Sequence, residues 1–144
     1  MFRRILVPVD GTVHSEYAIA YAIDLASAVD AEVIVCRVVT TPAAANSSSD
    51  SRSAARYVSD VAQRFRDAGI VTKTQVRRGD AAMEIRRTAV DWEADAIVMA
   101  TRGRRRLEKL MLGSVAEAVV RDSRLPVLLV STRRRSKGEL YRAA

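Results

Sequence analysis

The chain alternates short apolar runs with amphipathic segments along its length, and this alternation constrains its fold more than any other feature. Continuous apolar runs are typical of strands that are covered on both faces, and the segments between them repeat apolar residues at helical spacing. This order predicts a parallel sheet wrapped by helices on both faces through right-handed crossovers. The predicted strands are 5–9, 32–39, 70–77, 95–100 and 126–130, and the predicted helices are 15–29, 54–68, 80–92 and one that begins at 113–114.

Three local patterns refine this prediction. Residues 40–53 contain Pro42 and a run of serines, which is typical of a loop and suits a flap. Strand 70–77 alternates apolar and polar residues, so we expect it to be half exposed and nearer an edge of the sheet. In the first helix, the residues predicted to face the core are Ala18, Ala22, Leu25, Ala26 and Val29.

Length and charge indicate a single domain with a basic tail. The 144 residues, of which 49% are apolar, suffice for one core, and we expect a domain over 1–132 and a disordered tail over 133–144. The net charge of +7 is concentrated in segments 102–109 and 131–144, so the rest of the domain is nearly neutral. This distribution favours a local anion site plus a tail over a broad nucleic-acid-binding face.

Several residues have an ordinary structural interpretation. Cys36 is the only cysteine and lies in an apolar run, so we expect a buried, inert thiol and neither a disulfide nor a metal cluster. His14 is the only histidine and is predicted to lie on the surface. The carboxylates of Asp91, Glu93 and Asp95 are expected to form a solvated turn. The apolar N-terminal run is too short to span a membrane, which predicts a cytoplasmic location.

Candidate binding residues gather where predicted strands end. Ligands in parallel sheets bind beyond the carboxyl ends of the strands, which here are followed by Asp10, Val38 with Val39, and Met99 with Ala100. For Asp10, a turn-forming side chain is the alternative.

The loop after the fourth predicted strand carries the most informative spacing. Ala100 precedes Gly103 by three residues, and nine further residues lead to Gly113 and Ser114 at a helix start. Glycines let backbone N–H groups approach a phosphate, and the helix N-terminus and a hydroxyl add to the cradle. An ordinary turn at Gly103 and an ordinary N-cap at Gly113 remain the alternative.

Arginines flank this glycine, and one or two of them, Arg102 and Arg104 first, are predicted to bind phosphate oxygens. A solvated charged surface is the alternative. The sequence contains neither a dinucleotide fingerprint nor a P-loop, so phosphoryl transfer would lack its usual lysine.

Four stretches together resemble the universal stress protein family. They are Ile-Leu-Val-Pro-Val-Asp-Gly-Thr at 5–12, Asp-Ala-Ile-Val-Met-Ala at 95–100, Leu-Gly-Ser-Val at 112–115, and Leu-Pro-Val-Leu-Leu-Val at 125–130. The resemblance spans nearly the whole chain. It implies an α/β three-layer sandwich of the adenine nucleotide alpha hydrolase-like type, with a five-stranded, mostly parallel sheet and helices on both faces.

The resemblance also implies roles for individual residues. Asp10 would reach the ribose, the backbone of Val38 would meet the adenine, and the glycine loop would hold the phosphates. Ala100 replaces the first glycine of the family motif, which is tolerable if the site needs only a backbone group but strained if φ is positive. The complete candidate set is Pro8, Asp10, Val38, Met99, Ala100, Arg102, Gly103, Arg104, Gly113, Ser114 and Val115.

The function implied is a cytoplasmic stress-response regulator that binds ATP or AMP, with or without Mg²⁺, and acts as a dimeric switch on an unknown protein partner. The homodimer would form through strand 126–130, because an uncharged apolar strand at a sheet edge invites pairing. The alternatives are a slow ATPase, for which only Asp10 offers a general base, and a basic protein that binds nucleic acid weakly.

Overall fold

The computed structural model describes residues 1–40, 47–101 and 113–131. The predicted tail over 133–144 therefore lies outside the described residues. None of the described helices combines the length and the apolar composition needed to cross a bilayer. The elements are β1 (Arg4–Pro8), α1 (Val13–Val29), β2 (Glu32–Val39), α2 (Ser47–Asp67), β3 (Thr72–Arg78), α3 (Ala81–Asp91), β4 (Ala96–Thr101), α4 (Ser114–Asp122) and β5 (Val127–Ser131).

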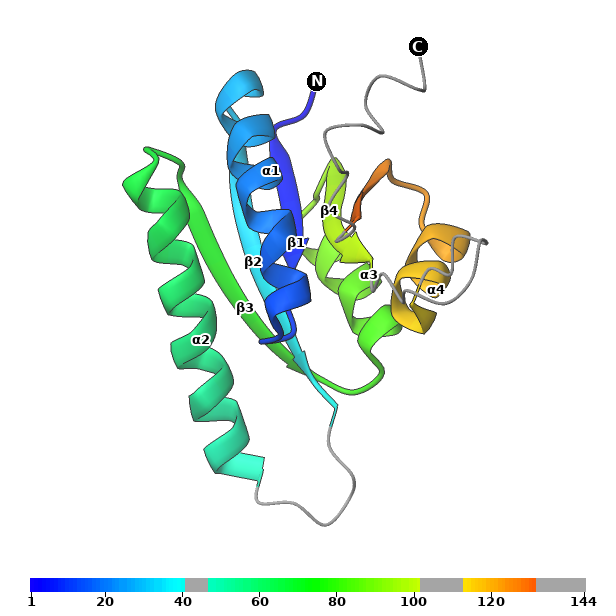
Figure 1. Cartoon of the computed structure of the whole chain (residues 1–144). Coiled ribbons are helices and arrows are strands. Elements are labelled where there is room, and N and C mark those ends of the chain that lie inside the picture. The colour runs from blue at the N-terminus through cyan, green and yellow to red at the C-terminus, as the bar shows by residue number, and fades with distance from the viewer. Residues whose placement is uncertain (41–46, 102–112, 132–144) are drawn as a thin grey trace, which may run out of the picture.

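The five strands form one sheet in the order β3-β2-β1-β4-β5, and every neighbouring pair is parallel (Figure 1). From the central β1 the chain first adds β2 and β3 on one side, then crosses to add β4 and β5 on the other. The direction of winding therefore reverses between β1 and β4, which is where open α/β sheets bind ligands. The predicted parallel sheet and the edge position of strand β3 are confirmed.

Helices cover both faces of the sheet, which confirms the three-layer architecture. Successive side chains of a strand point to opposite faces. Ile5 and Val7 of β1 accordingly pack with Phe65 and the rest of the α1 and α2 side, while Leu6 and Ile34 pack with α3 and α4. All five of these side chains are fully buried.

Helix α2 begins earlier than the sequence predicts. The prediction of a loop over 40–53 is wrong from Ser47 onward, because α2 starts there. Asp50 lies in the first turn, where the helix dipole favours a carboxylate. The Ser51 hydroxyl accepts hydrogen bonds from Arg78 Nε at 3.1 Å and from Arg78 Nη2 at 2.7 Å. These bonds fasten the start of α2 to the end of β3, so tertiary contact overrides the low helix propensity of serine.

Helix α1 ends at Val29, as the sequence predicts, but this last residue does not reach the core. Val29 was predicted to face inward, but it is 38% exposed. Asp30 adopts the left-handed conformation, with φ of 54°, and its N–H bonds to the carbonyl of Ala26. Ala31 N–H bonds to the same carbonyl at 3.0 Å as the chain turns into β2, which leaves Val29 at the open end of the helix.

Asp95 anchors the N-terminal segment to the sheet. Its Oδ2 accepts hydrogen bonds from the backbone N–H of Arg3 at 2.6 Å and of Arg4 at 2.9 Å. These backbone bonds hold the pKa of the Asp95 carboxyl below its usual range. Glu93 forms an ion pair with Arg4 at 3.1 Å. The acidic turn before β4 therefore has a structural role in joining the chain's start to β4.

We expect Asp95→Ala to lower the free energy of unfolding by about 1 kcal/mol at pH 7, because two backbone N–H groups lose a charged but partly exposed acceptor. The pKa of Asp95 is lowered in the folded state, so its contribution is complete above the unfolded pKa and disappears as the pH falls through the folded pKa. Urea unfolding of wild type and variant from about pH 5 to about pH 2 should therefore show the difference shrinking.

Asp24→Ala is the matched control, because Asp24 is exposed on α1 and makes no hydrogen bond or ion pair with the described residues. A destabilisation by Asp95→Ala that stays constant over this pH range would contradict the anchoring role.

Candidate functional site

A pocket of about 390 Å³ opens at the carboxyl end of the sheet, where β1 stops between β2 and β4. Its size suits a small organic ligand. The pocket lies at the carboxyl ends of the strands, as the sequence predicted, and at the point where the winding reverses. It is lined by Pro8, Val9, Asp10 and Ser15 around the end of β1, Cys36 and Val38 of β2, Ala81 and Ile85 of α3, Met99 and Ala100 of β4, and Gly113, Ser114, Val115 and Ala116 at the start of α4.

Pro8 is the reason that the sheet opens here. β1 pairs with β2 as far as Pro8, but it pairs with β4 only through Ile5 and Leu6. The backbone N–H groups of successive residues in a strand point to opposite neighbours. Because Val9 N–H donates to the Cys36 carbonyl in β2 at 2.8 Å, the nitrogen of Pro8 faces β4. Proline has no N–H to donate, so the ladder toward β4 ends and a crevice forms.

The backbone of Val38 faces the same opening. The Val39 carbonyl accepts a hydrogen bond from Gly79 N–H at 3.2 Å, on the β3 side of β2. The N–H and C=O of Val38 therefore point the other way, toward β1. Beyond Val9 the chain turns into α1, so the strand that would pair with Val38 on this side has ended. One backbone donor and one acceptor thus line the pocket wall.

The turn after β1 presents Asp10 to the pocket. Asp10 Oδ1 accepts hydrogen bonds from Thr12 N–H at 2.9 Å and from the Thr12 hydroxyl at 2.6 Å. Gly11 has a φ of 82°, and a Cβ there would lie 3.3 Å from the Arg37 guanidinium, so the turn requires glycine. Asp10 therefore shapes the turn and lines the pocket at once, and the two interpretations of this residue are compatible.

The end of β4 and the start of α4 form the opposite wall. Ala100 lies within β4 and pairs with Val130, so its backbone is extended and an alanine is unstrained there. Gly113 is the N-cap of α4, with φ of −55° and no side-chain cap, and Ser114 is exposed at the first helical position. The N-terminus of α4 thus directs backbone N–H groups and a positive dipole end at the pocket.

The structure brings together most of the residues that the sequence singled out. The eight predicted residues that line this pocket are Pro8, Asp10, Val38, Met99, Ala100, Gly113, Ser114 and Val115. The other three, Arg102, Gly103 and Arg104, lie outside the described residues.

Sequence reasoning missed several lining residues, of which Ser15, Cys36, Ala81 and Ile85 are the clearest. Cys36 was predicted only as a buried thiol. It is buried, burial raises the pKa of its thiol, and its Sγ lies 3.7 Å from the Thr88 hydroxyl. The available signal was spacing, because Cys36 precedes Val38 by two residues and so shares its face of β2.

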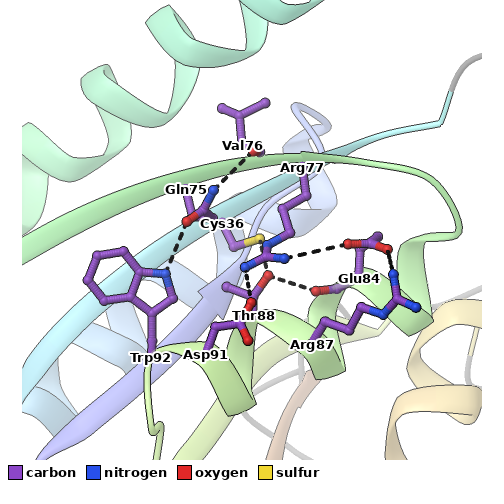
Figure 2. Close-up of polar contacts among 9 residues, drawn as sticks. All are labelled: Cys36, Gln75, Val76, Arg77, Glu84, Arg87, Thr88, Asp91 and Trp92. Carbon is purple, nitrogen blue, oxygen red and sulfur yellow. Dashed lines mark hydrogen bonds and ion pairs between the residues drawn. The ribbon is translucent and has the colours of Figure 1, made fainter.

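Helix α3, which supplies Ala81 and Ile85 to the pocket, is held against β3 by a network of polar side chains (Figure 2). Arg77 of β3 forms ion pairs with Glu84, at 3.9 Å, and with Asp91. Glu84 lies in the first turn of α3 and Asp91 is its last residue, so Arg77 contacts both ends of the helix. Glu84 is only 8% exposed and also pairs with Arg87 at 3.0 Å. The network fixes α3 along β3 and thereby fixes one wall of the pocket.

Two further contacts in Figure 2 complete this attachment. Trp92 Nε1 donates to Gln75 Oε1 at 3.1 Å, which ties the end of α3 to β3. The Thr88 hydroxyl donates to the Glu84 carbonyl at 2.7 Å, inside the helix and next to Cys36.

The described part of the chain contains no group of three or more His, Cys, Asp or Glu side chains arranged to hold a metal ion. His14 is exposed in the first turn of α1, as predicted for a surface residue, and it is not among the residues that line the pocket.

Comparison with known proteins gives the family. The Universal stress protein family matches residues 1–131. Universal stress protein MJ0531 of Methanocaldococcus jannaschii is 33% identical over 143 residues, which cover 90% of this chain and 82% of that protein. The solved structure of MJ0577 from the same organism has a TM-score of 0.76 at 25% identity, covering 94% of this chain and 99% of that one.

A second solved structure adds a ligand to the comparison. The crystal structure of a universal stress protein in complex with cAMP has a TM-score of 0.71 at 25% identity, and covers 92% of this chain and 98% of that one. The shared fold, described above from the sheet outward, is the nucleotide-binding alpha hydrolase-like fold. The chain therefore belongs to the universal stress protein family.

Proposed function

We propose that this universal stress protein binds an adenine nucleotide, ATP or AMP, at the carboxyl end of the sheet and acts in the cytoplasm as a dimeric stress-response switch. The observation that carries the proposal is the pocket between the open backbone edge of Val38 and the N-terminus of α4. The relative crystallised with cAMP supports an adenine nucleotide as the ligand.

The adenine base suits the Val38 side of the pocket. The 6-amino group of adenine donates a hydrogen bond and N1 accepts one, which complements a backbone C=O and N–H side by side. Pro8, Met99 and Ile85 provide apolar surface for the ring.

The ribose and phosphates suit the other end. Asp10 is proposed to accept hydrogen bonds from ribose hydroxyls, while Gly113, Ser114 and the N-terminus of α4 bind phosphate oxygens. Arg102, Gly103 and Arg104 would complete the phosphate site, with Mg²⁺ bound to the nucleotide itself where it is present.

The residues of the pocket favour binding over turnover. Asp10 and Cys36 are the only titratable side chains among its described lining residues, and burial raises the pKa of the Cys36 thiol. Asp10 is engaged in the turn after β1. Hydrolysis of ATP, if measured as phosphate release, should therefore be slow.

The first experiment compares adenosine with inosine by isothermal titration calorimetry. Inosine has a 6-oxo group and an N1–H, so its donor and acceptor are reversed relative to adenine while its ribose is identical. We expect adenosine to bind at least about tenfold more tightly, because the reversed pair leaves the Val38 backbone groups unsatisfied. Equal affinities for adenosine and inosine would show that the Val38 backbone does not form hydrogen bonds with the base.

A short DNA duplex titrated at two salt concentrations in the same series tests the nucleic-acid alternative, for which we expect only weak binding that falls with salt. Tight duplex binding at physiological salt, together with no adenosine binding, would replace the proposal by that alternative.

We expect Gly113→Val to abolish ATP binding, because the branched side chain blocks the approach of a phosphate to the backbone of the α4 N-terminus. The backbone of Gly113, with φ of −55°, accepts any residue, so the fold should persist. Gly113→Ser is the comparison variant: it supplies a cap to α4, and should be at least as stable as wild type yet bind ATP more weakly. A folded Gly113→Val protein with wild-type affinity would contradict the phosphate site.

The homodimer is proposed to form through strand β5, the strand that the sequence predicted as 126–130 beginning at Pro126. β5 lies at one edge of the sheet, and its Leu128 is 46% exposed. The opposite edge strand, β3, is protected by exposed Lys73 and Arg78. Because β5 is the uncharged edge and β3 the charged one, this difference supports β5 as the edge that pairs with a second copy.

We expect the wild-type protein to sediment as a dimer at micromolar concentration and Leu128→Arg to shift it toward monomer, since a charge on the edge strand opposes pairing. Val90→Arg is the matched control, because Val90 is 75% exposed on α3 and away from β5. A wild-type monomer, or equal dissociation by both variants, would rule out β5 as the interface.

A further inference from the structure

The carboxylate of Asp10 is oriented by hydrogen bonds from Thr12, which belong to a connected set that also includes Ser15. The Thr12 hydroxyl donates to Asp10 Oδ1 at 2.6 Å, and Thr12 N–H donates to the same oxygen at 2.9 Å. The Ser15 hydroxyl accepts from Asp10 N–H at 3.2 Å and donates to the Thr12 carbonyl at 3.0 Å. The backbone and the side chain of Asp10 are thus both tied to the first turn of α1.

Within this set the Thr12 hydroxyl has two separable roles. As the N-cap of α1 it accepts a hydrogen bond from Ser15 N–H at 3.3 Å, which is a long contact. As a donor it bonds to Asp10 at 2.6 Å, the distance typical of a hydroxyl bonded to a charged oxygen. The hydroxyl has one hydrogen, and that hydrogen points at the carboxylate.

The surroundings keep this arrangement rigid. Ser15 is 8% exposed and itself lines the pocket. A Cβ on Gly11, between Asp10 and Thr12, would lie 3.3 Å from the Arg37 guanidinium, which also lies over the Tyr57 ring at 5.7 Å from its centre. Arg37 of β2 thus lies close to the turn and connects it to Tyr57 of α2.

We propose that Thr12 is a positioning residue, which sets the Asp10 carboxylate for the ribose hydroxyls of the bound nucleotide. This inference rests on the proposed function and explains how the pocket would distinguish a ribose from a sugar without hydroxyls. A carboxylate that rotates freely must lose side-chain freedom when it binds a hydroxyl, whereas one that is already fixed does not. Thr12 therefore contributes only to the affinity that the ribose hydroxyls provide.

The test measures the affinities of ATP and 2′,3′-dideoxy-ATP by calorimetry for wild type and for Thr12→Val, which keeps the shape of threonine but lacks the hydroxyl. We expect Thr12→Val to lose about tenfold in ATP affinity and to bind the dideoxy analogue within about twofold of wild type. Thr12→Ser, which restores the hydroxyl, should recover ATP affinity.

Thr72→Val is the matched control. It also removes a threonine hydroxyl, which donates to the Ile70 carbonyl at 2.9 Å, but it lies at the other end of the sheet. Both valine variants are expected to lower the thermal midpoint, and only Thr12→Val should change the ratio of the two affinities. This ratio separates positioning from a general loss of stability.

Other outcomes overturn the inference in distinguishable ways. Equal losses for ATP and the dideoxy analogue would assign Thr12 a purely structural role as the cap of α1. Unchanged ATP affinity in Thr12→Val would show that the hydroxyl does not orient Asp10 in the complex. If wild type binds neither nucleotide, the proposed function itself fails, and the inference fails with it.

Discussion

The end of β1 at Pro8 is the constraint on which the rest of the site depends. A central strand in a parallel sheet normally pairs with both neighbours along its length, and proline removes one donor from that pattern. On the β4 side the ladder stops at Leu6, and on the β2 side it stops with the bond from Val9. The opening toward β4 follows from this missing N–H, while the turn after Val9 leaves the backbone of Val38 unpaired and brings Asp10 to the pocket.

The pocket combines elements from both layers of helices. The turn that carries Asp10 leads into α1, which covers one face of the sheet, while Ile85 and Val115 come from helices that cover the other. A ligand in this pocket would contact both layers across the end of β1. Its binding would therefore resist separation of the two layers and stabilise the fold as a whole.

The fold and the candidate pocket followed largely from the sequence, because both depend on local patterns. Apolar runs identify buried strands, and parallel strands bring their carboxyl ends to one edge, so the sequence alone predicts that Asp10, Val38 and Met99 lie together. Strand β3 was placed at an edge for the same reason, through its alternating polar residues.

What the sequence did not predict depends on contacts between distant elements. The start of α2 at Ser47 depends on the hydrogen bonds between Ser51 and Arg78 of β3, and the local sequence does not predict this contact. Ile85 reaches the pocket because Arg77 and Glu84 fix α3 along β3. Three candidates, Arg102, Gly103 and Arg104, fall outside the described residues, so they stay predictions.

The extended backbone at Ala100 changes how related sequences should be compared. The glycine that usually opens this motif is not needed for its conformation in a chain like this one, because the position lies inside a strand. Because Ala100 lines the pocket, the volume of the side chain at this position matters more than its backbone freedom. A sequence pattern for this motif can therefore accept alanine as well as glycine at this position.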